Sequence, residues 1–304
     1  MTMISVVMGV YNAADTLRET LDSIVGQEDV ELEVIVVDDG STDGTGAILE
    51  DYQDIRVIRQ ENRGLTRALI AGCAAARGTL IARQDAGDLS HPRRLVTQQR
   101  MLEDPEVTFV SCATQYVGPE GEPLWIAHPT GVALVPAHVL DLGVPNTLTD
   151  GPTHHGSVMF RRDAYERAGG YRAQFYYGQD FDLWFRLAAL GKFQTTKEVL
   201  YTARIAPNSI SGVARHAQRR LGELSRAALE ARMRGVPEDR ILAEAAAIRR
   251  VAGGVVSPGS GLYFIGEALR RNGDARARSY FRRAIAAQPL SLRAWTRYLQ
   301  SLLL

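Results

Sequence analysis

The stretch EVIVVDDGS, residues 33–41, runs from a buried β-strand directly into an acidic turn. Glu33–Val37 has the length and β-branched composition of a strand, and the Asp, Gly and Ser residues after it favour a turn. Short β-rich runs alternate with helical runs on both sides of this stretch. Such alternation is typical of a parallel sheet covered by helices on both faces. We therefore expect an α/β fold.

The flanking elements extend this alternation over the first hundred residues. The sequence predicts strands over Ile4–Val10, Arg56–Arg59 and Thr79–Arg83, and helices over Asp15–Gln27, through Ile48 and Leu49, and over Leu65–Ala76. Thr16 and Glu19 have the spacing of a capping box at the start of the first helix. Right-handed crossovers place the carboxyl ends of parallel strands on one edge, where α/β folds bind ligands. We expect the polar clusters after the first, second and fourth strands at that edge.

The second half of the chain is less regular and ends in helices. We predict strands over Val107–Val117, Pro123–His128 and Gly156–Arg161, the first two of which could form a hairpin. We predict a helix over Gln179–Leu190. Residues 129–153 are rich in Pro and Gly and show no periodicity. After residue 214 almost everything is helical, and Tyr263–Trp295 has the spacing of a single tetratricopeptide unit, which we interpret as a helical hairpin. We expect an α/β domain at 1–213 and an all-helical extension at 214–304.

The charge distribution changes at the same boundary. Residues 1–213 hold 18 Lys and Arg against 28 Asp and Glu, whereas residues 214–304 hold 17 against 7, although the whole chain is neutral. The basic extension could bind an anionic membrane surface, dock on the acidic domain or support a homodimer. A solvated face on amphipathic helices explains the charge equally well. We expect no nucleic-acid partner.

The composition excludes several classes of protein. A chain of 304 residues with 45% hydrophobic residues can bury a core and is not disordered. Two cysteines, Cys73 and Cys112, do not support a disulfide framework or a cysteine zinc site. No apolar run reaches the roughly 20 residues of a spanning helix, and the amino terminus has no basic region typical of a signal peptide. We expect a cytoplasmic protein.

Three carboxylate clusters remain once common motifs are excluded. The chain has no GxGxxG after the first strand, no Walker A lysine, no HExxH and no GxSxG. Within Asp38–Ser41, an aspartate could bind a pyrimidine ring or ribose hydroxyls, or cap a helix. Asp85 and Asp88 could hold Mg²⁺ or Mn²⁺, or form an Asx-turn before the next helix. Asp180 and Asp182 could supply a general base, or only balance a helix dipole.

A series of short motifs occurs in a fixed order between residue 3 and about 211. The series comprises Ser5–Asn12, Val36–Asp43, Arg63–Leu65, Ala76–Gly78, Ala82–Asp88, Pro92, Arg94-Leu95, His155–Arg161, Gly169–Tyr171 and Gln179–Trp184. It resembles the family 2 glycosyltransferases, which are inverting enzymes of the GT-A fold. The resemblance implies a Rossmann-like, mostly parallel sheet covered by helices. It also implies transfer of a sugar from a nucleoside-diphosphate donor, UDP-linked, to a saccharide or lipid-linked acceptor of a bacterial surface polysaccharide.

The resemblance assigns roles on the donor side of the site. Tyr11 would contact the nucleotide base, and Asp39 would hydrogen-bond the uracil-like ring or the ribose. Arg67 would lie near the base or the phosphates. Asp85 matches the first acid of the family's DxD motif and would face the ribose and the sugar. The donor site is thus expected at the ends of the predicted strands.

On the acceptor side, Asp180 matches the family's catalytic base. It would deprotonate the acceptor hydroxyl as that oxygen attacks the anomeric carbon opposite the nucleotide, which inverts the configuration. His155 lies where the acceptor side of the cleft is built. Both residues are therefore expected to face the donor sugar.

The chain departs from the family pattern where metal is bound. Gly87 replaces the last acid of the DxD motif, so that Asp88 would have to bind the metal together with Asp85. Ala206 stands where the family often has a metal-binding histidine. These changes motivate an alternative to the glycosyltransferase, a catalytically weak sugar-nucleotide-binding protein that acts as a scaffold through its helical extension. A nucleotidyltransferase would need a glycine-rich basic loop after the first strand, which Gly9–Asp15 lacks.

Overall fold

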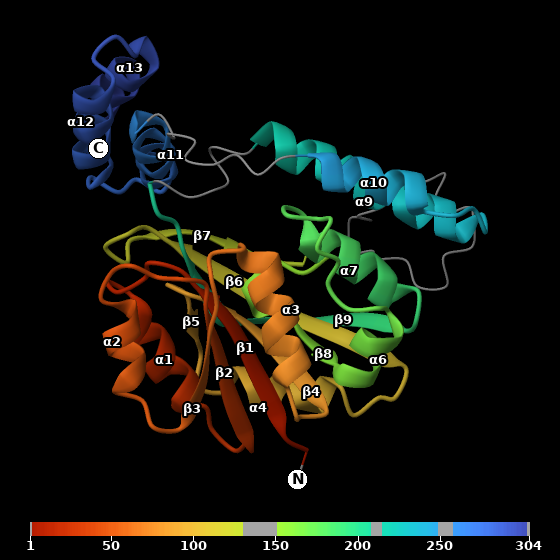
Figure 1. Ribbon diagram of the computed structural model, residues 1–304. Helices are drawn as coiled ribbons and strands as arrows, with labels where there is room; N and C mark the ends of the chain where they lie inside the picture. The colour runs from red at the N-terminus through yellow and green to blue at the C-terminus, as the bar shows by residue number, and fades with distance from the viewer. Residues whose placement is uncertain (1, 130–150, 208–214, 249–257, 303–304) are drawn as a thin grey trace.

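A single sheet of nine strands organises the computed structural model, which describes residues 2–129, 151–207, 215–248 and 258–302 (Figure 1). The strands are β1 (Ile4–Val10), β2 (Leu32–Asp38), β3 (Ile55–Arg59), β4 (Leu80–Asp85), β5 (Leu89–Ser90), β6 (Val107–Val117), β7 (Pro123–Ala127), β8 (Met159–Arg161) and β9 (Lys192–Arg204). Their order is β3-β2-β1-β4-β8-β6-β9-β5, and β7 pairs with β6. Strands β1 to β4 are mutually parallel, so the expected α/β fold is confirmed.

Helices cover both faces of this sheet. In the first 207 residues the described helices are α1 (Leu17–Val25), α2 (Thr45–Glu50), α3 (Leu65–Ala75), α4 (Arg94–Met101), α6 (Arg162–Arg167) and α7 (Gln179–Ala188). Alternate residues of a strand point to opposite faces. Val6 therefore joins the core under α1 and α4, and Val7 joins the core under α3 and α7. Helix α3 lies very close to β1, because a Cβ at Gly72 would come within 2.5 Å of the Val7 side chain.

Three local predictions differ from the structure. The capping box is absent, because Thr16 makes no side-chain cap and Glu19 instead pairs with Arg204 at 2.7 Å. The strand predicted over Gly156–Arg161 begins only at Met159, after a 3-10 turn at His155–Ser157. The long strand β9 was not predicted. It runs parallel to β6 and completes the second half of the sheet.

The helical extension consists of two groups that pack on different parts of the sheet domain. Helices α9 (Arg215–Met233) and α10 (Asp239–Ala247) lie beside α7, while α11 (Pro258–Arg271), α12 (Ala277–Ala287) and α13 (Leu292–Ser301) lie beyond β7 (Figure 1). In the first group, Leu229 joins the core below α3, and Glu238 pairs with Arg172 at 2.6 Å. In the second group, Leu124 of β7 packs among the helices. The extension therefore packs on the sheet domain at two separate places, through α9 against α7 and through α11 against β7.

The predicted tetratricopeptide-like hairpin falls on α11 and α12, which pack against each other. Gly266 of α11 allows the close approach, because a Cβ there would lie 3.0 Å from the Phe281 ring. Residues 130–150, most of the non-periodic stretch, lie outside the described residues. The division into domains at residue 213 stays a prediction. None of the described helices is both long and apolar enough to cross a bilayer.

Candidate active site

The end of β4 carries a carboxylate that is paired with a buried arginine. Arg83 is fully buried and donates to Oδ1 of Asp85 and, at 3.1 Å, to the carbonyl oxygen of Val7. Burial alone would raise the pKa of Asp85, but the charge of Arg83, the two neighbouring histidines and the hydrogen bond from Arg83 together outweigh burial and lower that pKa to about 2. Asp85 is therefore held ionised at the strand end.

A second carboxylate, Asp88, lies three residues further on and is even less exposed. Its Oδ2 accepts a hydrogen bond from the Tyr201 hydroxyl at 2.9 Å, and its Oδ1 accepts from the Arg204 backbone N–H at 2.9 Å. The same Tyr201 oxygen accepts from the backbone N–H of Asp85 at 3.1 Å. Burial and then the negative charge of Asp85 raise the pKa of Asp88 to about 8. A cation between the two carboxylates would relieve this repulsion.

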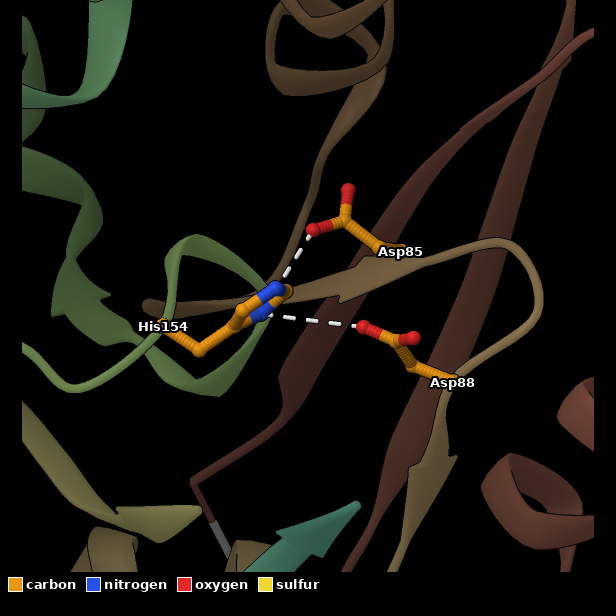
Figure 2. A group of neighbouring side chains, drawn as sticks. All are labelled: Asp85, Asp88 and His154. Carbon is orange, nitrogen blue, oxygen red and sulfur yellow. Dashed lines mark ion pairs between the residues drawn. The ribbon is translucent and has the colours of Figure 1, made fainter. Parts of the chain in front are cut away.

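His154 completes this group (Figure 2). Its Nδ1 lies 3.8 Å from Oδ2 of Asp85 and 3.6 Å from Oδ2 of Asp88, and one donor atom of each residue falls within 4.8 Å of the others. Burial lowers the pKa of His154, which favours the neutral imidazole that ligates metals. Two carboxylates and an imidazole suit Mn²⁺ and also Mg²⁺. The donor set therefore fits a divalent metal.

The adjacent His155 has different surroundings. Its Nε2 is hydrogen-bonded to the Tyr171 hydroxyl at 2.9 Å, and its ring packs edge-on against Trp184. Burial, followed by the charge of Arg83, lowers its pKa to about 3. His154, and not His155, is therefore the histidine placed to bind a metal, and it was not identified from the sequence. Substrate binding by His155 stays a prediction.

The end of β2 carries the carboxylate expected to bind the nucleotide. Asp39 is buried and accepts hydrogen bonds from the Gln60 side chain and from the backbone N–H groups of Arg63 and Gly64, at 2.6 to 2.8 Å. It therefore fixes the turn that leads into α3. Asp38 accepts from the Ser41 N–H at 2.9 Å, which is the alternative turn-forming role. Since β1 separates β2 from β4, the ends of these strands lie two strand spacings apart, roughly 10 Å.

Tyr11 and Arg67 lie beside this turn and reach into solvent. The loop after β1 is tied to the loop after β2, because the Asn12 backbone N–H donates to Ser41 Oγ at 3.0 Å and the Asn12 side chain accepts from the Thr42 N–H at 2.8 Å. Tyr11 in this loop is 48% exposed. Arg67 is exposed on the first turn of α3. Both side chains are accessible to a ligand at the strand ends.

Asp180 lies on the first turn of α7, which follows Gly178 at φ +71°. Burial raises its pKa to about 6, and the negative charge of Asp85 adds to the shift. Asp182 has a structural role instead, because it pairs with both Arg172 and Arg186 and is nearly inaccessible. The two acids of the motif therefore lie in different surroundings, and only Asp182 is paired with arginines.

The sequence comparisons agree with this geometry. A family model described as glycosyl transferase family 2 matches residues 5–169. A Bacillus subtilis protein named EpsE, described as a glycosyltransferase, is 34% identical over 211 residues, which cover 66% of this chain and 72% of that protein. The chain belongs to glycosyltransferase family 2.

Solved structures confirm that this family 2 glycosyltransferase has the GT-A fold. Staphylococcus aureus TarS in complex with UDP is 17% identical, with a TM-score of 0.53 over 98% of this chain and 90% of that chain. The mannosyltransferase PcManGT from Pyrobaculum calidifontis, in complex with GDP-Man and Mn²⁺, is 21% identical, with a TM-score of 0.55 over 99% of this chain and 84% of that chain. At these identities the likeness concerns the fold alone.

Within the glycosyltransferase, the predicted residues form two groups along one sheet edge. Asp85 and Asp88 lie together, and Asp180 interacts electrostatically with Asp85. Tyr11, Asp39 and Arg67 form the neighbouring group around the ends of β1 and β2 and the start of α3. Two residues escaped the sequence prediction. One is His154, which directly precedes the predicted His155. The other is Tyr201 on β9, and the alternation of apolar and polar residues from 201 to 204 is a strand signal that could have revealed it.

The pH dependence of folding stability should reveal the desolvated Asp180 carboxylate. Its folded-state pKa of about 6 exceeds the unfolded value of about 3.9. The folded state thus binds more protons between these values, so this group reduces stability as the pH rises through about 4 to 6. We expect Asp180→Asn to have a higher Tm than the wild type near neutral pH, with a difference that shrinks below about pH 4.

The control is Asp163→Asn, which alters an exposed acid on α6. Calorimetric Tm values across the pH range provide the measurement. A constant difference between Asp180→Asn and wild type at every pH would contradict the raised pKa.

Proposed function

We propose that this glycosyltransferase transfers a sugar from a nucleoside-diphosphate donor, UDP-linked, to a hydroxyl of a saccharide or lipid-linked acceptor with inversion. The observation that carries the proposal is the pair formed by Asp85, held ionised by Arg83, and the desolvated Asp180, whose pKa responds to the charge of Asp85. Asp85 would bind on the side of the donor, and Asp180 would act on the hydroxyl of the acceptor.

The donor would bind across the ends of β1, β2 and β4. Tyr11 and Arg67, which are both exposed, would contact the base and the phosphates. Asp39 retains acceptor capacity beyond its three hydrogen bonds, since each carboxylate oxygen has two lone pairs. It would use this capacity toward the uracil or the ribose. The UDP assignment is supported by TarS, which has been solved with UDP and with UDP-GlcNAc.

Asp85, Asp88 and His154 would hold a divalent metal, Mn²⁺ or Mg²⁺. Gly87, at φ +95°, lets the chain turn so that Asp88 points back toward Asp85. When bound, the metal would neutralise negative charge on the donor diphosphate. The Mn²⁺ in the PcManGT structure supports this proposal, and His154 would supply the imidazole that a histidine at position 206 often supplies in the family.

Asp180 would act as general base in a single displacement. Its carboxylate takes the proton of the acceptor hydroxyl while the acceptor oxygen bonds to the anomeric carbon. The bond from that carbon to the diphosphate breaks on the opposite face, and the nucleoside diphosphate leaves. A pKa of about 6 keeps Asp180 ionised near neutral pH and still basic enough to share a proton. His155 would border the acceptor side.

Replacing Asp180 by Asn should abolish turnover while leaving the donor site intact. Because general-base catalysis contributes roughly 10²–10⁴-fold, we expect kcat to fall by at least about a hundredfold. The affinity for UDP, measured by calorimetry, should stay within about twofold of wild type. Asp163→Asn is again the control and should retain wild-type turnover. Near-wild-type kcat in Asp180→Asn would remove Asp180 from the role of base.

Metal should strengthen nucleotide binding through the Asp85, Asp88 and His154 group. We expect Mn²⁺ to tighten UDP binding by about tenfold or more in the wild type, and His154→Ala and Asp88→Asn to lose most of this gain. Calorimetric titration of UDP with and without Mn²⁺ provides the measurement, and His155→Ala is the matched control. Metal-independent UDP binding together with no hydrolysis of any sugar nucleotide would instead favour the scaffold function.

We further propose that residues 214–304 hold the cytoplasmic enzyme against an anionic membrane surface. Leu292, Trp295 and Leu299 of α13, together with Leu302 at its C-cap, form an exposed apolar stripe at helical spacing. The extension that carries this stripe holds 17 Lys and Arg against 7 Asp and Glu, and such basic residues add about 1 kcal/mol each at an anionic surface. Residues 1–213 would then form the catalytic domain and 214–304 the targeting domain. A homodimer through the same stripe is the competing proposal.

Sedimentation with vesicles separates these proposals. We expect the wild type to bind vesicles that contain an anionic lipid more strongly than neutral vesicles, and the double variant Leu292→Ser/Leu299→Ser to lose this binding. Val25→Ser, which alters an exposed apolar residue on α1, is the control. Equal partitioning of the wild type onto both kinds of vesicle would contradict membrane targeting. If the wild type is a dimer and the double variant is a monomer, the homodimer proposal is favoured instead.

A further inference from the structure

A cavity of about 430 Å³ opens beside Asp180, between α7 and α9. This volume lies within the range of about 300–1,000 Å³ that is usual for small-molecule sites. The two helices approach closely here, since a Cβ at Gly178 would lie 3.8 Å from the backbone nitrogen of Gly222. The cavity is therefore lined by the Asp180 carboxylate on one side and by helix α9 on the other.

The two walls of the cavity differ in chemistry. Phe181 and Phe185 of α7 provide an apolar wall. The α9 wall is polar and cationic, because Gln218, Arg219 and Arg226 lie on one helical face. The cavity thus offers an apolar surface and guanidinium donors on opposite sides of a carboxylate.

The two arginines are available to a ligand. Arg226 is exposed and has no hydrogen bond or ion pair with any residue of the described ranges. The Arg219 side chain is 73% exposed and only approaches Glu223, at 3.9 Å. Most other arginines of α9 are engaged, as Arg220 is with Glu223 and Glu244. Unengaged guanidinium groups bind phosphate or carboxylate with paired hydrogen bonds.

We propose that this cavity binds the acceptor and selects an anionic saccharide, with Arg219 and Arg226 contacting a phosphate or carboxylate group near the reacting hydroxyl. The proposal rests on the proposed function, because it takes Asp180 as the base. Its specific content is that helix α9 determines acceptor specificity by charge. Phe181 and Phe185 would support the apolar face of the sugar.

Gly222 provides a way to close the cavity without disturbing the fold. It lines the cavity between the two arginines, and a Cβ there would meet nothing within 4 Å. Gly222→Leu should therefore fill the space with a good helix former. Arg219→Gln/Arg226→Gln removes the charges and keeps hydrogen-bonding capacity. Arg234→Gln, which changes an exposed arginine outside the cavity, is the control.

The experiment measures sugar binding by NMR titration of the full chain with UDP and Mg²⁺ present in excess, so that the donor site is occupied. The probes are glucose 6-phosphate, glucuronate and glucose. We expect glucose 6-phosphate and glucuronate to bind at least about tenfold more tightly than glucose to the wild type and to Arg234→Gln. The double Gln variant should lose this preference, and Gly222→Leu should lose binding of all three sugars.

Other outcomes overturn the inference. Equal binding of glucose and the two anionic sugars would contradict it, as would an unchanged preference in the double Gln variant. A loss of UDP affinity in that variant, with the preference intact, would assign the arginines to the donor diphosphate instead. If the wild type binds no UDP but the anionic sugars still require both arginines, the proposed function fails and the anionic site remains.

Discussion

The site depends on two carboxylates held side by side by one buried arginine and one buried tyrosine. Burial, and after it the negative charge of Asp85, raises the pKa of Asp88, so the two carboxylates oppose each other's ionisation. Arg83 offsets the charge of Asp85, and the Tyr201 hydroxyl bridges the two residues by accepting from one and donating to the other. Unpaired charges in such a position would cost several kcal/mol. The same arrangement makes the pair of carboxylates attractive to a cation.

The sheet explains why these groups meet. Strands β1, β2 and β4 end at one edge, which places the turn at Asp39 and the acidic loop at Asp85–Asp88 along the same edge. Strand β9 brings Tyr201 under the acidic loop, and Gly156 leaves room for it, since a Cβ there would lie 1.9 Å from the Tyr201 hydroxyl. Helix α7, which packs in the hydrophobic core on the α3 side of the sheet, carries Asp180. The carboxylates that we propose for the donor and for the acceptor thus come from separate elements that the same sheet supports.

Much of this site could be predicted from local sequence because strand ends are local features. The acidic turns after β2 and β4 follow buried runs, and both were placed at the correct edge. The position of His154 beside the carboxylates could not be predicted, because neighbouring side chains point in different directions and the 3-10 turn at His155–Ser157 fixes which ring meets the carboxylates. Strand β9 was missed because its middle, from Gln194 to Glu198, is polar and its pairing with β6 is long-range.

The position of a bound nucleotide tests the convergence of these residues most directly. A crystal structure of the full chain with UDP and Mn²⁺ should place the uracil beside Asp39 and the diphosphate beside Asp85, Asp88 and His154. The terminal phosphate should then face Asp180 across the space for a sugar. Nucleotide bound at another surface, or a metal held without Asp88 and His154, would contradict the proposed site.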